Sequence, residues 1–315
     1  MKLLFGALIA MSPLLAEQVS YEESQRDVNA YIAQNKDEQL FLDPTFREEL
    51  ADIGGKIVLD AGCGAWSIKA AREGAQVCAL NESPQMRAVM SESDVDGQIA
   101  FFEGDVFSLP YPNETFDRIL SLNVGANLPS SIHMRSEEGC GLEQHCEELA
   151  RVMKEGGRMV LVAPASYDTV FTDDSVDENA AMQKIEKVLG KITTVDNPEE
   201  IVRRLEELQE VNRATFVRRG NRLVLVTDMR QLKLGEQIWR KEPSGIYLSY
   251  YHNEEEYLVT FRKVGLVCEE IKRPCFFGRV KYNLFHKDLP SGEKGLGSAY
   301  IENNPFTIYT ISKPV

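Results

Sequence analysis

The sequence predicts an α/β fold built around a mostly parallel sheet. Short apolar runs alternate with amphipathic helical stretches between Lys56 and Pro164. Alternation of this kind implies parallel strands joined by right-handed crossovers. After Pro164 the alternation stops, and helices and a hairpin follow before it resumes near Glu254. The interruption predicts an inserted α+β cap.

The core elements follow from apolar runs and from the residues that bound them. Ser83 and Pro84 are typical of a helix start, and Gly74 and Gly156-Gly157 are typical of helix ends. Strands are expected at 57–59, 76–80, 99–102, 116–122, 159–162, 266–271 and 306–311. Helices are expected at 66–73, from 84 to about 91, at 142–154 and at 254–264.

The cap is expected to hold two helices, 179–190 and 198–212, followed by a hairpin. Asn197 caps the second helix, and the hairpin joins 214–218 to 222–227 through Gly220-Asn221. One face of the second helix is apolar, so it either covers the site as a lid or is exposed to a partner. That face consists of Ile201, Leu205, Leu208 and Val211.

Five parts are expected along the chain. They are a signal-like or anchoring segment (1–16), an N-terminal helical lid (17–55), a ligand-binding core (56–164), the cap or substrate region (165–253), and a C-terminal part that completes the core sheet (254–315). The connection at 274–305 is long enough to be functional. Residues 1–16 have a basic start and a short apolar run, too short to span a bilayer.

Charge and cysteine content narrow the class of protein. The 315 residues carry a net charge of −14, so nucleic acid is not an expected partner. The six cysteines show no CxxC spacing and no pairing with the four histidines, so no metal site is expected. We expect a cytoplasmic enzyme without an integral membrane span, the alternative being export or membrane association through residues 1–16.

The most informative motif is Val58-Leu-Asp-Ala-Gly-Cys-Gly64, which ends the first strand. Its glycines allow a sharp turn and a close approach of the backbone to a ligand. Asp60 precedes the loop, where a carboxylate would disfavour a pyrophosphate but favour a cationic sulfonium or ammonium group. Ser67 stands where a dinucleotide-binding loop has its third glycine. Asp60 could instead cap the following helix.

From residue 56 to 164 the chain resembles the class I S-adenosylmethionine-dependent methyltransferases, particularly small-molecule enzymes of the type-11 kind. The resemblance lies in the glycine loop, in Gly104-Asp105-Val106-Phe107, and in the segment from Glu148 to Gly157. It implies a Rossmann-like, seven-stranded, mostly parallel sheet with an antiparallel last strand. It also implies that S-adenosylmethionine contacts Asp60, Ala61, Gly62, Cys63, Gly64, Asn81, Glu82, Asp105, Val106, Leu122 and Asn123.

The resemblance implies that Asp60 lies near the amino acid end of the cofactor. It also implies that residues at the end of the second strand bind the ribose of the cofactor. By the same resemblance, Asp105 and Val106 recognise adenine, and Leu122-Asn123 lies beside the reacting methyl group. The chain departs from the family pattern at three positions. Trp66 replaces a frequent glycine, Asn81 replaces an acid, and Glu155 replaces a proline.

Substrate contacts are expected from Tyr247 to His252, ahead of the last core helix. Tyr250 and Tyr251 are candidate substrate residues, and His252 is a candidate general base. An equally simple interpretation has His252 packing at the helix start. His133 follows the fourth strand and is a second candidate base.

The predicted function is methyl transfer from S-adenosylmethionine to a small organic acceptor. A non-catalytic binding or scaffold protein, including a homodimer formed through the insertion, is the first alternative, and a dinucleotide-dependent oxidoreductase is the second. The sequence leaves open which acceptor is used, whether oxygen, nitrogen or carbon is methylated, and whether residues 1–16 are cleaved.

Overall fold

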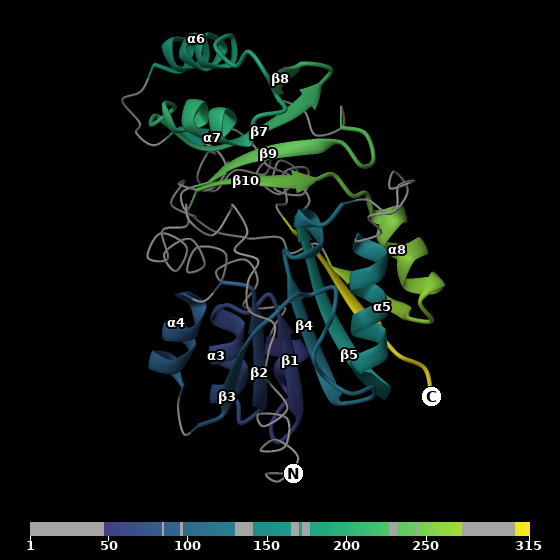
Figure 1. Ribbon diagram of the computed structural model, residues 1–315. Coiled ribbons are helices and arrows are strands. Elements are labelled where there is room, and N and C mark those ends of the chain that lie inside the picture. The colour runs from purple at the N-terminus through teal and green to yellow at the C-terminus, as the bar shows by residue number, and fades with distance from the viewer. Residues whose placement is uncertain are drawn as a thin grey trace, which may run out of the picture.

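The computed structural model describes residues 47–83, 85–94, 97–129, 141–164, 170–171, 177–226, 232–242, 245–272 and 306–315. The signal-like segment, the predicted lid before residue 47, His133 and the connection 274–305 therefore lie outside the described residues. Figure 1 shows a core of one sheet between helices, with a second sheet and its own helices beyond one end of the core.

The core sheet has seven strands in the order β11-β12-β5-β4-β1-β2-β3. They are β1 (Ile57–Ala61), β2 (Gln76–Asn81), β3 (Ile99–Glu103), β4 (Phe116–Leu122), β5 (Met153–Pro164), β11 (Val267–Lys272) and β12 (Phe306–Ser312). The first five strands pair in parallel, and β12 is antiparallel to both of its neighbours. The predicted fold class, with its antiparallel last strand, is confirmed.

Helices cover both faces of this sheet. Leu59 of β1 and Leu149 of α5 (Leu142–Val152) belong to one apolar cluster, which also takes Phe261 of α8 (Glu254–Lys263). The neighbouring Val58 points to the other face, where α3 (Ala65–Arg72) and α4 (Gln85–Ser93) contribute Trp66 and Met90. Alternate residues of a strand thus fill two cores, as expected for a sheet buried on both faces.

The strand order places the candidate site. The chain runs outward from β1 through β2 to β3 and then crosses to β4 on the other side of β1. Ligands of open α/β sheets bind outside the carboxyl ends of the strands at such a reversal. The carboxyl ends of β1 and β4, with the short helix η2 (Gly125–Asn127) that follows β4, therefore mark the expected position.

The cap is built on a second, five-stranded sheet. Strands β7 (Val211–Arg219) and β8 (Arg222–Leu225) form the predicted hairpin. The sheet is completed by β6 (Val170–Phe171), β9 (Gln237–Glu242) and β10 (Gly245–Tyr250), and the helices are α6 (Glu178–Leu189) and α7 (Pro198–Glu206). Figure 1 shows β9 and β10 on the side of the cap that faces the core.

The second cap helix is shorter than expected. Its predicted span of 198–212 is wrong, because α7 ends at Glu206 and Val211 begins β7. The apolar face of Ile201, Leu205, Leu208 and Val211 is buried within the cap, packed with residues such as Phe216 and Trp239. The expectation that this face is a lid or an exposed partner surface is therefore also wrong.

A further difference concerns the last turn before β5. The helix expected at 142–154 ends at Val152, and Met153 already has extended backbone and pairs with Phe116. Gly156 and Gly157 lie inside β5 rather than at a helix end. Gly156 has φ +69° and donates its N–H to Lys313, so the glycine pair serves an irregular strand beside the C-terminal residues.

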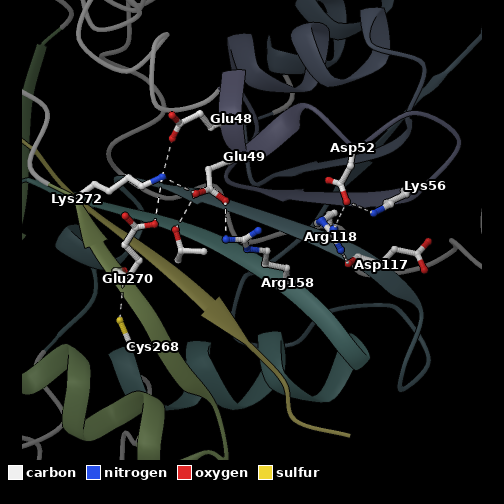
Figure 2. A network of polar contacts seen from close by, with 11 residues as sticks. Glu48, Glu49, Asp52, Lys56, Asp117, Arg118, Arg158, Cys268, Glu270 and Lys272 are labelled. Atoms are coloured by element: carbon white, nitrogen blue, oxygen red, sulfur yellow. Dashed lines mark hydrogen bonds and ion pairs between the residues drawn. The ribbon is translucent and has the colours of Figure 1, made fainter.

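A cluster of charged residues around the buried Glu49 joins the chain before β1 to the β11–β12 side of the sheet (Figure 2). The Glu49 carboxylate lies 3.1 Å from Lys272 Nζ and 3.5 Å from Arg158, and it accepts a hydrogen bond from Thr310. Burial alone would lower the pKa of Lys272, but its hydrogen bonds to Glu48 and Glu49 raise it above its usual value. The cluster therefore holds residues 48–49 against β11 and β12.

Lys272→Met is expected to lower the free energy of unfolding by about 1–2 kcal/mol, because Glu49 keeps Arg158 and Thr310 but loses its ammonium partner. Chemical denaturation measures the difference. Lys263→Met removes an exposed ion pair with Glu143 and is the matched control, with an expected change below about 0.5 kcal/mol. Equal losses in both variants would contradict a stabilising role for the cluster.

Candidate functional site

The glycine loop after β1 is closed by its own hydrogen bonds. Gly62 has φ +83°, and a Cβ there would lie 2.3 Å from Cγ2 of Val124. The N–H groups of Gly62 and Cys63 both donate to the carbonyl oxygen of Leu80, at 2.8 Å. Gly64 donates its N–H to Asp60. The loop therefore presses against β2 and the chain after β4, and these N–H groups do not face a phosphate.

Asp60 lies fully buried at the end of β1. Its Oδ2 accepts hydrogen bonds from Ser67 Oγ at 2.6 Å and from the Gly64 N–H at 3.3 Å, so the side chain does bind the start of α3. Its Oδ1 is buried without a hydrogen-bond partner. Burial raises the pKa of Asp60 to about 6, although the Ser67 hydrogen bond opposes the shift. The ionised carboxylate is thus short of compensating partners.

Asn123, at the end of β4, also has a buried side-chain oxygen without a hydrogen-bond partner. Its backbone is left-handed, with φ +59°, and its N–H donates to Val162 across the sheet. Its side-chain Oδ1 is buried without a hydrogen-bond partner. Since β1 and β4 are neighbours, the structure places two unsatisfied acceptors, from Asp60 and Asn123, at the carboxyl ends of adjacent strands. Buried acceptors of this kind suit a cationic N–H donor.

At the end of β2, the side chain of Asn81 makes two hydrogen bonds within the protein. Asn81 accepts a hydrogen bond from the Ser83 N–H at 2.9 Å and donates one to the Cys63 carbonyl at 3.3 Å. Its amide thus ties the glycine loop to the next helix start. Glu82, the neighbouring candidate for the ribose hydroxyls, is exposed.

Asp105 and Val106 lie in the loop that follows β3. Asp105 is exposed, and its Oδ1 accepts the Phe107 N–H at 2.8 Å. Val106 is half-buried, and its carbonyl oxygen lies 3.2 Å from Nδ1 of His145 on α5. This loop and the glycine loop follow strands that end at the same edge of the sheet.

The remaining cofactor candidates are Ala61, Cys63 and Leu122. Ala61 and Cys63 are buried, and Leu122 is half-buried at the end of β4. Burial and the nearby charge of Asp60 raise the pKa of the Cys63 thiol well above its usual value. These residues line the carboxyl edge of the sheet and are not expected to make polar contacts with the cofactor.

His252 is held by the protein on both ring nitrogens. Nε2 lies 2.7 Å from the Leu128 carbonyl oxygen, and Nδ1 lies 2.8 Å from the Glu256 carboxylate. Asn253 caps α8, as the simpler interpretation expects. With both nitrogens engaged in buried contacts, this geometry favours a packing role and disfavours His252 as a general base.

The two candidate substrate tyrosines are half-buried where β10 ends. Tyr250 is the last residue of β10, and Tyr251 packs against the cap residues Val217 and Ile238. The structure therefore places Tyr251 in a cap cluster, beyond the carboxyl edge of the core sheet.

Sequence reasoning missed Arg240, which joins the cap to the core. This buried side chain donates to Ser249 at 2.7 Å and to Asn127 of η2 at 2.8 Å. Ser249 also donates to Asn127. The residue is in β9, one of three described strands of the cap that the sequence did not predict, so no pattern pointed to it. It lies next to the end of β4, beside the candidate site.

The chain is similar to known methyltransferases. Residues 59–161 match the family described as "Methyltransferase domain". Malonyl-[acyl-carrier protein] O-methyltransferase of Erwinia pyrifoliae is 26% identical over 61% of this chain and 75% of its own length. Methyltransferase GfsG of Streptomyces halstedii is 27% identical over 48% of this chain and 60% of its own. An S-adenosylmethionine-dependent methyltransferase structure from Mesorhizobium loti aligns with TM-score 0.47 and 14% identity, over 85% of this chain and 95% of that one.

The family match covers β1 to β5, the same elements that carry the glycine loop, the Asp105 loop and the unsatisfied acceptors of Asp60 and Asn123. No helix among the described residues is long and apolar enough to cross a membrane. The ordered motifs, the strand order and the family match together identify residues 59–161 as a methyltransferase domain of the class I, S-adenosylmethionine-dependent kind.

Proposed function

We propose that the protein transfers the methyl group of S-adenosylmethionine to a small organic acceptor. The observation that carries the proposal is the pair of buried, unsatisfied acceptors on Asp60 and Asn123, at the point where the strand order reverses. An amino acid ammonium group satisfies both acceptors, and its charge compensates the buried carboxylate. Named relatives include a probable tocopherol O-methyltransferase and a sterol 24-C-methyltransferase, which agrees with a small-molecule acceptor.

When bound, S-adenosylmethionine supplies an electrophilic methyl group. Asp60 and Asn123 would hold its amino acid end, and Gly62 lets the loop pack closely against Val124. Asp105 and Val106 would hold adenine, with Glu82 near the ribose and Asn81 positioning the loop. The protein contributes mainly alignment and exclusion of water, and alignment is worth about 7–11 kcal/mol in favourable cases.

The rival functions receive less support. In a dinucleotide-dependent oxidoreductase the glycine loop would direct N–H groups at a pyrophosphate, whereas those of Gly62, Cys63 and Gly64 are bonded within the protein. A scaffold protein or homodimer acting through the insertion would use the apolar face of α7, which the cap itself covers. We also propose a cytoplasmic location, where thiols stay reduced and the cofactor is made; four described cysteines are free.

Incubating the purified protein with a metabolite extract and S-adenosylmethionine carrying an isotopically labelled methyl group tests this function. We expect mass spectrometry to find at least one small molecule that gains the labelled methyl group, together with S-adenosylhomocysteine. The Gly62→Val variant is the control and should form both products more slowly at a cofactor concentration below saturation. Label found only in macromolecules would overturn the small-molecule acceptor, and no transfer despite cofactor binding would favour a non-catalytic protein.

A further inference from the structure

One face of α5 holds the backbone of the loop that follows β3. Four side chains spaced along the helix make the contacts. Gln144 donates to the Phe107 carbonyl, His145 contacts the Val106 carbonyl, Glu148 accepts the Leu109 N–H, and Arg151 donates to the carbonyls of Leu109 and Tyr111. The spacing of three or four residues places these side chains on one side of the helix. The loop conformation is therefore set by α5.

His145 makes the innermost of these contacts and is completely buried. Its Nδ1 lies 3.2 Å from the Val106 carbonyl oxygen, and its Nε2 lies 3.2 Å from Ser121 Oγ on β4. A carbonyl oxygen only accepts, so Nδ1 carries the hydrogen and Nε2 accepts from the Ser121 hydroxyl. Burial lowers the pKa of His145 to about 4, so the ring is neutral at neutral pH. One tautomer satisfies both contacts.

The peptide group that His145 contacts is also hydrogen-bonded to the side chain of Asp105. The Val106 carbonyl and the Phe107 N–H belong to the same peptide group. His145 binds its oxygen, and the Asp105 carboxylate accepts its N–H at 2.8 Å. Fixing the oxygen fixes the plane of the peptide. That plane determines where the N–H points and hence how the Asp105 carboxylate is held.

We propose that His145 is a positioning residue that sets the preference of the cofactor site for adenine over purines lacking the 6-amino group. It acts through the Val106–Phe107 peptide, which orients the carboxylate of Asp105 toward that amino group. This inference rests on the proposed function, because it takes Asp105 and Val106 as the adenine contacts. Groups that support a binding contact in this way commonly affect affinity as strongly as the contact itself.

Calorimetric titration with S-adenosylhomocysteine and S-inosylhomocysteine tests the inference, since the second ligand has an oxygen in place of the 6-amino group. The wild-type protein should prefer the adenine ligand by about tenfold or more. His145→Ala should lose most of that preference. His145→Asn keeps a donor at the Nδ1 position and should retain it. Gln144→Ala breaks the neighbouring contact, to the Phe107 carbonyl, and should leave the preference unchanged.

The ratio of the two affinities distinguishes a positioning role of His145 from a general destabilisation of the fold. A general destabilisation lowers both affinities by the same factor and leaves their ratio unchanged. An unchanged ratio in His145→Ala overturns the inference while leaving the proposed function intact. A wild-type protein that binds both ligands equally also overturns it. Absence of binding to S-adenosylhomocysteine overturns the proposed function itself. If His145→Ala does not fold, His145→Leu is used in the same titration, with the same two outcomes.

Discussion

Gly62→Val is expected to weaken binding of S-adenosylmethionine by about tenfold or more. A Cβ at this position would lie 2.3 Å from Val124, and φ +83° is strained for any residue with a side chain. Relieving the overlap moves either the glycine loop or the chain after β4, and both carry unsatisfied acceptors that we assign to the cofactor. Calorimetry on the folded variant measures the loss.

Gly55→Ala is the matched control for this substitution. Gly55 also has a positive φ, +74°, but a Cβ there would meet nothing within 4 Å. Its cost is limited to backbone strain of about 1 kcal/mol, with no effect on cofactor affinity. Unchanged affinity in Gly62→Val, or equal losses in both variants, would show that the close approach to Val124 does not shape the site.

Asp60→Asn is expected to weaken cofactor binding by about tenfold or more and to stabilise the protein without cofactor at pH 8. The amide oxygen can still accept from Ser67 and Gly64, so the start of α3 stays bound. The amide nitrogen then occupies the place of the unsatisfied Oδ1 and presents a donor where an ammonium group needs an acceptor. Calorimetry and thermal unfolding measure the two effects.

The pH dependence of this stabilisation has a defined sign. The pKa of Asp60 rises from an ordinary 3.8 to about 6 on folding, so the folded state favours the protonated carboxyl group. The resulting stability is complete below about pH 4 and is lost as the pH rises through about 6. The variant should therefore gain about 1–3 kcal/mol over wild type at pH 8 and little at pH 4. A variant less stable than wild type at pH 8 would contradict this account.

Much of the fold was predictable because the core elements have strong local patterns. β4 was predicted with its correct bounds, since the four apolar residues among Phe116 to Leu122 lie between segments rich in turn-forming residues. The antiparallel last strand was not visible in any local pattern and came from the family resemblance. The sequence did not indicate β9, because Gln237 to Glu242 mixes charged and apolar residues, and it did not indicate β10, which pairs with β9 in antiparallel register.

The cofactor residues were proposed from motif order, whereas their contacts depended on the tertiary structure. The sequence suggested a ribose contact for Asn81, but folding brings its amide against the carbonyl of Cys63. A histidine can act as a general base, and the sequence suggested this role for His252. In the structure, however, Glu256 of α8 contacts one ring nitrogen and the carbonyl of Leu128 contacts the other. His145 lies in a helix that the sequence predicts, but no local pattern links it to a ligand-binding loop. Its link to the Asp105 loop became visible only once α5 was placed beside that loop.

Titration of the wild-type protein with S-adenosylmethionine, and separately with NADH, tests the central claim most directly. We propose that the buried acceptors of Asp60 and Asn123 bind a cationic ligand, and the glycine loop has its N–H groups bonded within the protein. We therefore expect saturable binding of one S-adenosylmethionine per chain and no binding of NADH. Binding of NADH without binding of S-adenosylmethionine would contradict the account.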